Sequence, residues 1–315
     1  MSFIPLLGTM KQPLANAVAR AALGFKPLER MIAAACRRPA LLKSFGVGAV
    51  AVGYSRVLSQ PELRVADMQH YRLQVNVAEE LGIGVFFFGN PGTLWFTPRL
   101  LRPGDCCVDA GANMGHYTFA MASEVGPSGR VLAFEANPAF VEMLNSSIAI
   151  NQYEGRIVVY GKALWEGSDL EMTFYISMNS ANSGTSSLVN HGFFLSPDRH
   201  IVVRTVTLDD AAREASIDHF RLVKIDVERA EEFVITGAHH LLSEHRIDFL
   251  IVELIAGTKA QELLSSHGYT GWLASNDRTT LTPIGEVTPG VFGDFLFASP
   301  AVLGEVALLS PNSGQ

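Results

Sequence analysis

The alternation of hydrophobic and polar residues is most regular between residues 106 and 138, where it predicts strand, turn, helix and strand. A short apolar run ends at Asp109, and a second apolar run ends at Glu135. Between them, four apolar residues recur at helical spacing and share one helix face: Met114, Tyr117, Met121 and Val125. We expect this face to pack on the sheet that the two strands begin.

Shorter apolar runs later in the chain continue the alternation. Residues 157–160, 221–227 and 249–254 predict a third, fourth and fifth strand. Asn137 followed by Pro138 is typical of a helix start, because asparagine caps backbone N–H groups and proline suits the first helical position. The pattern predicts an α/β fold whose open, Rossmann-like sheet has helices on both faces.

One segment departs from this simple alternation. Residues 169–190 contain the strand-like sequence EMTFYIS and a polar loop, and residues 201–207 alternate apolar and polar positions. We expect the two strand-like segments to pair as a β-insertion. Residues 269–274 and 294–298, joined by a Gly- and Pro-rich segment, should complete the main sheet.

The region before the sheet is less regular. Residues 65–80 fit a helix and a strand equally well. Residues 82–97 predict a β-hairpin, because Asn90, Pro91 and Gly92 form a turn signal between aromatic-rich runs. We therefore assign residues 65–100 to a helix and β-hairpin cap.

Residues 1–64 form a basic helical N-terminal extension, with helix-compatible segments at 15–23 and 28–37. This extension has nine Lys or Arg and two Glu, a balance of +7, which leaves −14 for the remainder of a chain whose net charge is −7. Its longest uncharged stretch, residues 45–55, is too short to span a bilayer. The extension is either an amphipathic element that contacts a membrane surface or partner, or a set of helices that cap the catalytic domain.

Composition narrows the class of protein. A chain of 315 residues with 48% hydrophobic content can bury a large core, which we place at residues 101–300 with a tail at 301–315. The negative net charge argues against nucleic acid as the main partner. Three cysteines, two of them adjacent, form neither a disulfide framework nor a metal-binding spacing. We expect a cytoplasmic protein.

The turn after Asp109 carries the first chemical signal, the pattern D-x-G-x-N-x-G. Glycine at 111 lets a ligand approach the backbone closely, and glycine at 115 permits tight packing of the helix on the strand. Asp109 would repel a pyrophosphate but could pair with an ammonium group, which favours S-adenosylmethionine over a dinucleotide. Glu135 could accept both ribose hydroxyls of a nucleoside.

Four motifs extend this signal in order along the chain: VDAGANMGHYT (108–118), FEANP (134–138), TVTLDD (205–210) and KIDVERAE (224–231). Their order and spacing resemble the FkbM-type S-adenosylmethionine-dependent methyltransferases, over roughly residues 101–254. The resemblance implies a class I methyltransferase sheet whose last strand is antiparallel. It also implies S-adenosyl-L-methionine as cofactor and O-methylation of a small-molecule hydroxyl on a sugar, polyketide or other secondary metabolite.

The resemblance assigns the cofactor site to particular residues. Asp109, Gly111, Asn113 and Gly115 would hold the methionine part, Glu135 the ribose, and Asn137 the edge of the nucleoside site. Ala163, which follows the third predicted strand, is expected beside the adenine ring.

The acceptor would lie beside the fourth predicted strand. Asp226, with Glu228, would orient and deprotonate the acceptor hydroxyl. Alternatively, Asp226 caps the helix that starts near Ala230, and Glu228 and Glu231 interact with the N-terminus of that helix.

Further substrate-binding residues come from neighbouring segments. The resemblance places Ser186 and Ser187 at the border of the site, and Glu253 ends the fifth predicted strand. Arg229 stands where family members commonly have glycine, so it would narrow the pocket or recruit an anionic acceptor. Asp226 and Glu253 could also ligate a divalent cation, but we assign no metal because carboxylates at strand ends more often orient substrate.

Two other functions stay open. A nicotinamide-dependent oxidoreductase is disfavoured by Asp109 and by the absent third glycine of the dinucleotide fingerprint. A non-catalytic protein with the same fold, acting as a partner or scaffold, is favoured by Arg229 and the basic extension. The acceptor and any homo-oligomer are not specified by the sequence.

Overall fold

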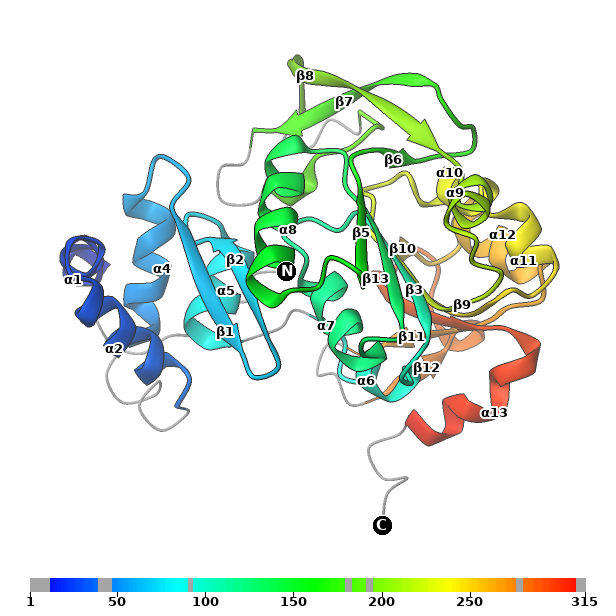
Figure 1. The fold of residues 1–315 in the computed structure, drawn as a ribbon, viewed down its shortest axis with the longest axis horizontal. Coiled ribbons are helices and arrows are strands. Elements are labelled where there is room, and N and C mark those ends of the chain that lie inside the picture. The colour runs from blue at the N-terminus through cyan, green and yellow to red at the C-terminus, as the bar shows by residue number, and fades with distance from the viewer. Residues whose placement is uncertain are drawn as a thin grey trace. The chain divides into compact units, whose positions relative to one another are not determined.

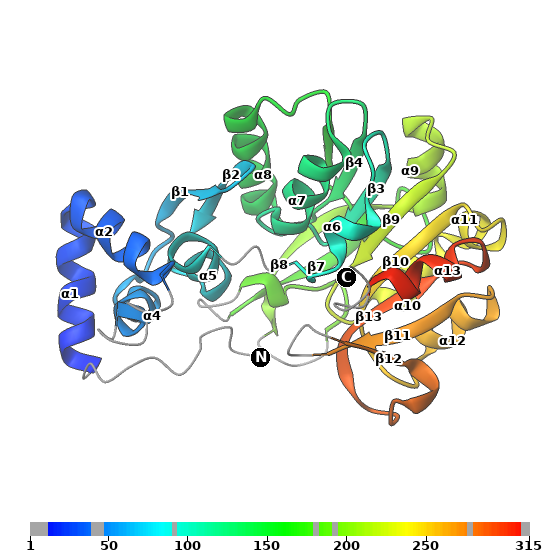
Figure 2. The same cartoon turned by 90° about the horizontal axis from the view of Figure 1, so that it is seen from below.

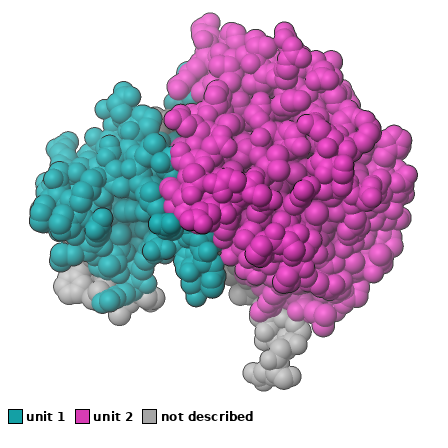
Figure 3. Space-filling model, viewed as in Figure 1, with its two compact units in different colours: residues 1–92, 177–185 teal, residues 93–176, 186–315 magenta. Residues whose placement is uncertain are grey.

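The computed structural model describes residues 12–38, 47–89, 93–178, 183–190, 195–275 and 280–309. The chain divides into two compact units, shown in Figure 3. Unit 1 comprises residues 1–92 and 177–185, and unit 2 comprises residues 93–176 and 186–315. Every residue that we assign to the cofactor or the acceptor belongs to unit 2.

Unit 2 is built on a sheet of eight described strands in the order β12-β11-β13-β10-β9-β3-β4-β5, seen side by side in Figure 2 from β4 to β12. Strands β5, β4, β3, β9 and β10 are parallel, and β13 runs antiparallel to both β10 and β11. The bounds are β3 Cys106–Ala110, β4 Arg130–Phe134, β5 Ile157–Tyr160, β9 Phe220–Ile225, β10 Ile247–Ile255, β11 Thr270–Ala274, β12 Leu281–Pro283 and β13 Phe292–Ala298.

This sheet confirms the predicted α/β fold, including the antiparallel last strand. Strand β3 lies between β4 and β9, so the connections that leave β3 and β9 run to opposite sides of the sheet. A crevice opens where connections diverge in this way, at the carboxyl ends of the strands. The topology therefore brings the residues after β3 and β9 to one place.

Helices cover both faces of the sheet. In Figure 1, α7 and α8 lie on one side, and α9 to α12 lie on the other. The bounds are α6 Thr97–Leu100, α7 His116–Val125, α8 Pro138–Asn151, α9 Leu208–Ala215, α10 Glu231–Thr236, α11 His239–Ser243, α12 Lys259–Ser266 and α13 Leu303–Val306, with short 3-10 turns at η2 Ile284–Glu286, η3 Pro300–Val302 and η4 Ala307–Leu309.

The local signals in the sequence account for the first two long helices. The four apolar residues that share a helix face, Met114, Tyr117, Met121 and Val125, are all buried, as predicted. Asn137 caps α8, because its side-chain oxygen accepts a hydrogen bond from the backbone N–H of Ala139 at 3.0 Å. Both predictions are confirmed.

The β-insertion is also confirmed. Strands β6 Ala163–Leu164, β7 Glu171–Ser177 and β8 Leu195–Val206 form a second sheet in the order β6-β8-β7, drawn at the top of Figure 1. The loop after β7 returns to it, because Tyr175 and Ser187 exchange two backbone hydrogen bonds of 2.9 and 3.1 Å. This contact holds the second sheet and its loop together.

Unit 1 contains helices and a β-hairpin. Its elements are α1 Gln12–Gly24, α2 Lys26–Cys36, α4 Val47–Val57, β1 Leu63–Met68, β2 Tyr71–Asn76, α5 Glu80–Phe88 and the turn η1 Ser183–Thr185. Helices α1 and α2 confirm the two helix-compatible segments of the extension. Among the described residues, no helix is both long and apolar enough to cross a membrane.

The β-hairpin predicted at residues 82–97 is wrong. Residues 80–88 form α5, and the antiparallel hairpin lies earlier, where β1 pairs with β2. The run GVFFF was misassigned because most of its residues are buried. Such a run has no alternation of apolar and polar positions that could distinguish a helix from a strand. Gly89 ends the helix with φ 62°, and the expected turn at residues 90–92 lies outside the described residues.

Arg221 lies near the start of β9 and anchors the edge of the sheet opposite the carboxyl ends of the parallel strands. Its guanidinium donates to the carbonyl of Leu100 at 2.7 Å and to Asp248 at 2.8 Å, and it also pairs with Glu305 of α13. Only 5% of the side chain is exposed, so these bonds are made away from solvent. Arg221 thus links β9 to β10, to the end of α6 and to α13.

We expect Arg221→Ala to lower the free energy of unfolding by about 3–5 kcal/mol, because the buried Asp248 carboxylate loses its guanidinium and keeps only the His219 imidazole at 3.0 Å among its described partners. Urea unfolding of the full chain measures this. Arg213→Ala is the matched control, since this arginine is 73% exposed and its ion pair with Asp210 should contribute about 0–1 kcal/mol. Equal losses in the two variants would contradict the structural role of Arg221.

Candidate active site

The turn after β3 is wedged between the ends of two other strands. The N–H groups of Gly111 and Ala112 both donate to the carbonyl of Phe134 at 3.0 Å, and the N–H of Asp226 donates to Ala110. Gly111 has φ 77°, and a Cβ at this position would lie 1.9 Å from the carbonyl oxygen of Asp226. Only glycine fits here, as the motif predicted.

Gly115 has a related but different role. A Cβ at this position would lie 2.6 Å from the side chain of Leu144 in α8 and 2.9 Å from the ring of Phe119. The close packing predicted for Gly115 is therefore present, but its neighbours are side chains of two helices.

Asp109 is fully buried at the end of β3. Its Oδ2 accepts a hydrogen bond of 2.5 Å from the hydroxyl of Thr118, whereas Oδ1 has no hydrogen-bond partner among the described residues. The ammonium of Lys224 lies 3.9 Å from Oδ1. Burial raises the pKa of Asp109, while Lys224 and Thr118 oppose that rise. The arrangement leaves a buried anionic oxygen available to a cationic group.

Glu135 is held rigidly at the end of β4. One carboxylate oxygen accepts from the backbone N–H of Asn113 and the other from the N–H of Asn137, both at 2.7 Å. Burial raises the pKa of Glu135 to about 7, against the lowering effect of these two bonds. Because each carboxylate oxygen has two acceptor positions, Glu135 can still receive two hydroxyl groups.

The side chains of Asn113 and Asn137 both accept hydrogen bonds from backbone N–H groups. The Asn113 oxygen accepts from the N–H of Met114 at 2.7 Å, and the Asn137 oxygen caps α8. Asn113 has φ 52°, a conformation that asparagine tolerates better than most residues. Both residues therefore contribute backbone N–H groups to Glu135. Ala163 is buried at the start of β6, opposite Thr205.

Lys224 is the important residue that the sequence reasoning missed. It is buried in β9, and its ammonium lies 3.1 Å from Asp226 Oδ2, 3.5 Å from the Gly111 carbonyl oxygen and 5.3 Å from the ring centre of Tyr117. Burial opposes the charge, but Asp226 and Asp109 outweigh it and raise the pKa of Lys224. A lone lysine inside the apolar run RLVKIDV was the available signal, because a buried cation requires an anionic partner.

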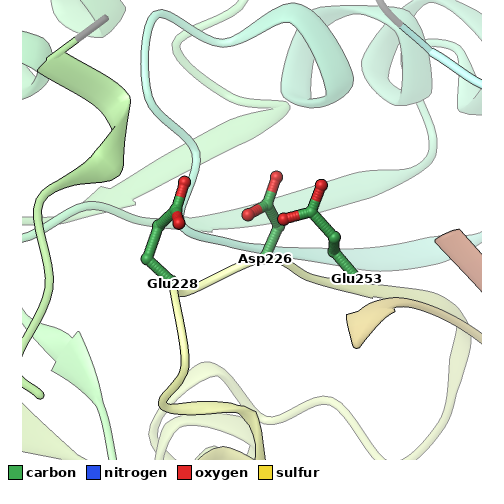
Figure 4. Close-up of side chains that lie close together, drawn as sticks. All are labelled: Asp226, Glu228 and Glu253. Atoms are coloured by element: carbon green, nitrogen blue, oxygen red, sulfur yellow. The ribbon is translucent and has the colours of Figure 1, made fainter. Parts of the chain in front are cut away.

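Asp226, Glu228 and Glu253 converge beyond this lysine. Figure 4 shows the three carboxylates turned toward one another, and one oxygen of each lies within 4.8 Å of the others. Burial, followed by repulsion from Asp226, raises the pKa of Glu228 to about 8 and that of Glu253 to about 9. Protonation is one way to relieve such crowding and a divalent cation is another, so the absence of a metal stays a prediction.

The turn after Asp226 is conformationally strained. Glu228 and Arg229 have φ of 54° and 78°, which is the left-handed region that favours glycine. An arginine at position 229 costs of order 1–3 kcal/mol in backbone strain. Asp226 does not cap α10, because the cap position is Ala230, and the carboxylate that accepts a backbone N–H there, from Arg229 at 3.0 Å, is that of Glu231. The helix-cap alternative for Asp226 is therefore wrong.

A pocket of about 190 Å³ opens beside this turn. Its lining includes Glu228, Arg229, Glu231, Glu253, Thr258 and Phe292. The Arg229 guanidinium carbon lies 5.9 Å from the centre of the Phe292 ring, within the range of a cation–π contact. The pocket therefore combines carboxyl groups, one cation and one aromatic ring.

The predicted serines lie next to the same turn. Ser186 and Ser187 are 8% and 1% exposed. The Ser187 hydroxyl donates to the carbonyl of Glu228 at 2.6 Å and accepts from the N–H of Val189 at 3.0 Å. Ser187 thus fixes the backbone of the turn, which is a positioning role.

These features define the class of protein. A parallel α/β sheet completed by an antiparallel strand, with carboxylates at the ends of β3, β4 and β9, has the fold of a class I methyltransferase. The family model for the methyltransferase FkbM domain matches residues 109–270, about half of the chain. The chain belongs to the FkbM methyltransferase family.

The chain is also similar to two individual proteins. The 31-O-demethyl-FK506 methyltransferase FkbM of Streptomyces tacrolimicus is 28% identical over 201 residues, which are 54% of this chain and 74% of that protein. The crystal structure of methyltransferase FkbM from Methylobacillus flagellatus KT is 16% identical, with a TM-score of 0.40. That match covers 89% of this chain but only 60% of the other.

We expect Gly111→Ala to lower the free energy of unfolding by about 3 kcal/mol or more, because the new methyl group collides with the Asp226 carbonyl at a positive φ. Thermal or urea unfolding measures the loss. Gly155→Ala is the control, since a Cβ there meets nothing within 4 Å and should change stability by about 0.5 kcal/mol or less. A stable Gly111→Ala variant would show that the two turns can separate.

The raised pKa of Glu253 predicts how stability depends on pH. A carboxyl group whose pKa is 4.5 when free and about 9 in the fold contributes stability that is complete below pH 4.5 and is lost as pH rises through 9. We expect Glu253→Gln to reduce the loss of stability between pH 6 and pH 9 by about 1 kcal/mol, because solvent screens the partly exposed carboxyl group.

Urea unfolding at both pH values tests this expectation. Glu262→Gln, an exposed change on α12, should leave the pH dependence as it is in the wild type. An unchanged slope in Glu253→Gln would mean that Glu253 is ionised in the folded protein.

Proposed function

We propose that the protein transfers a methyl group from S-adenosyl-L-methionine to the hydroxyl oxygen of a small molecule. The observation that carries the proposal is the buried Oδ1 of Asp109 in β3, which has the Lys224 ammonium at 3.9 Å but accepts no hydrogen bond within the described part of the chain. S-adenosylmethionine brings an ammonium group and a sulfonium, both cationic, whereas a nicotinamide dinucleotide brings two phosphates. A buried carboxylate favours the first ligand, and family membership agrees with it.

The residues around Asp109 fit the remaining parts of this cofactor. When bound, S-adenosylmethionine supplies an activated methyl group on its sulfonium. Gly111 and Gly115 keep the turn free of side chains, and Asp109 provides the charge that attracts an ammonium. Glu135, fixed by the N–H groups of Asn113 and Asn137, would accept the ribose hydroxyls.

Asp226 is the proposed base on the acceptor side. Its Oδ2 is bonded by Lys224 at 3.1 Å. Oδ1 would orient the acceptor hydroxyl and take its proton as the methyl group leaves the sulfur and bonds to the oxygen. Lys224 holds the carboxylate in place while contacting the Gly111 carbonyl, so it fixes the distance between the acceptor side and the cofactor side. Catalysis would rest mainly on this positioning.

Glu228 and Glu253 would bind the acceptor. With pKa values of about 8 and 9, both carboxyl groups are largely protonated near neutral pH and can donate as well as accept hydrogen bonds. They line the pocket with Arg229 and Phe292, which would contact the remainder of the acceptor. The name of the Streptomyces relative specifies transfer to an oxygen atom, which supports a hydroxyl acceptor.

A scaffold without catalytic activity is the second candidate. The strained arginine at position 229 favours it, because a bulky side chain in this turn reduces the room for an acceptor. Such a protein would keep its affinity for the cofactor and show no turnover.

Calorimetric titration with S-adenosylhomocysteine and, separately, with NADH tests the cofactor assignment. We expect binding of S-adenosylhomocysteine only. Glu135→Ala should weaken it by about 100-fold, because two hydrogen bonds to a charged group are lost. Asp226→Asn should change the affinity for S-adenosylhomocysteine less than threefold, since asparagine can still accept a hydrogen bond from Lys224.

The same variants test the acceptor side. On a panel of hydroxylated acceptors followed by mass spectrometry, Asp226→Asn should lower kcat by about 10²–10⁴-fold, the usual contribution of a general base. Asp218→Asn, at a fully exposed carboxylate, is the control. Failure of both ligands to bind would refute the cofactor assignment, and binding without turnover on the whole panel would favour the scaffold.

A further inference from the structure

The exposed positions of α1 and α2 carry cations and apolar side chains but no carboxylate. Residues 12–38 contain five basic residues, Arg20, Lys26, Arg30, Arg37 and Arg38, and all five are exposed. They contain a single acidic residue, Glu29, which is 2% exposed. The outward surface of these two helices is therefore strongly positive.

The inward position of Glu29 has a specific cause. Its carboxylate receives two hydrogen bonds from Arg64, at 2.8 and 3.0 Å, and one of 3.1 Å from the hydroxyl of Tyr54. Arg64 therefore neutralises Glu29 inside unit 1. Within residues 12–38, the acid is therefore turned inward, and of the five exposed cations it pairs with Lys26 alone.

Three of the five cations form no ion pair or side-chain hydrogen bond within the described residues. Lys26 lies 3.5 Å from Glu29, and Arg37 donates to the carbonyls of Asp67 and Phe86. By contrast, no ion pair or hydrogen bond of the Arg20, Arg30 or Arg38 side chains is found in the described parts of the chain. These three arginines are available to bind anions.

Large apolar side chains are exposed in the same segment, residues 12–38. Leu14, Phe25 and Met31 are 57%, 60% and 68% exposed. Phe25 occupies the corner where α1 ends and α2 begins, one residue before Lys26, and Met31 follows Arg30. We call the set Leu14, Arg20, Phe25, Arg30, Met31 and Arg38 the basic apolar surface.

We propose that the basic apolar surface binds the headgroup region of anionic membranes. Helices that lie in a membrane interface combine cations, which meet anionic lipids, with apolar side chains that enter the acyl boundary. Charge complementarity also favours contact through this part of the chain, because residues 1–64 balance to +7 while the rest of the chain balances to −14. Phosphate binding alone would not use exposed leucine and methionine, which disfavours a nucleic acid as the occupant. This surface is independent of the proposed methyl transfer.

Co-sedimentation of the full chain with lipid vesicles at 0.1 M salt tests the proposal. We expect binding to vesicles of phosphatidylcholine with 30% phosphatidylglycerol and none to phosphatidylcholine alone. Arg20→Gln/Arg30→Gln/Arg38→Gln should weaken binding by about 100-fold, since each cation near an anionic surface contributes roughly fivefold. Phe25→Ser/Met31→Ser should weaken it by about tenfold or more through lost apolar burial.

The matched control is Arg199→Gln/Arg204→Gln/Arg213→Gln, which removes the same charge from exposed positions of unit 2 and should bind as the wild type does. Unchanged melting temperatures exclude unfolding as the cause of a loss. Equal losses in both triple variants, no binding to anionic vesicles, or no effect of Phe25→Ser/Met31→Ser would each overturn the proposal. So would displacement of the vesicles by single-stranded RNA that binds more tightly through the same arginines.

Discussion

The site depends on one buried ammonium, that of Lys224. Transfer of an isolated charge into a protein interior is strongly unfavourable, so Lys224 requires the carboxylates on both sides of it, Asp109 at 3.9 Å and Asp226 at 3.1 Å. These two carboxylates end neighbouring strands, β3 and β9, and the parallel topology brings them to the same edge of the sheet. The electrostatic requirement of one side chain and the register of the strands are therefore satisfied together.

Much of the fold could be predicted from local patterns. Residues 106–138 combine apolar runs, turn glycines and a helix cap, and each signal agrees with the others, so strand, turn, helix and strand form as expected. The pairing of the β-insertion and the antiparallel last strand followed from alternation and from the family resemblance. The prediction failed at residues 82–97, where a largely buried aromatic run has no polar face to reveal its period.

The geometry of the site was less accessible to sequence reasoning. Asp109, Gly111 and Glu135 stand at recognisable positions in motifs, whereas the convergence of Glu228 with Glu253 depends on how β9 and β10 pair and on two left-handed residues after Asp226. The importance of Lys224 is set by contacts across strands. Charge and hydropathy alone likewise cannot show that Glu29 turns inward, because that orientation depends on Arg64, thirty-five residues further along the chain.

The close approach of Gly111 to the Asp226 carbonyl has a thermodynamic consequence. With no space between the two turns, a displacement of one backbone must displace the other. A ligand that restricts the motion of the turn after β3 therefore also restricts the turn after β9. A second ligand that binds there then loses less conformational entropy on binding. Such cooperativity is reciprocal, so each ligand would raise the affinity for the other by the same factor.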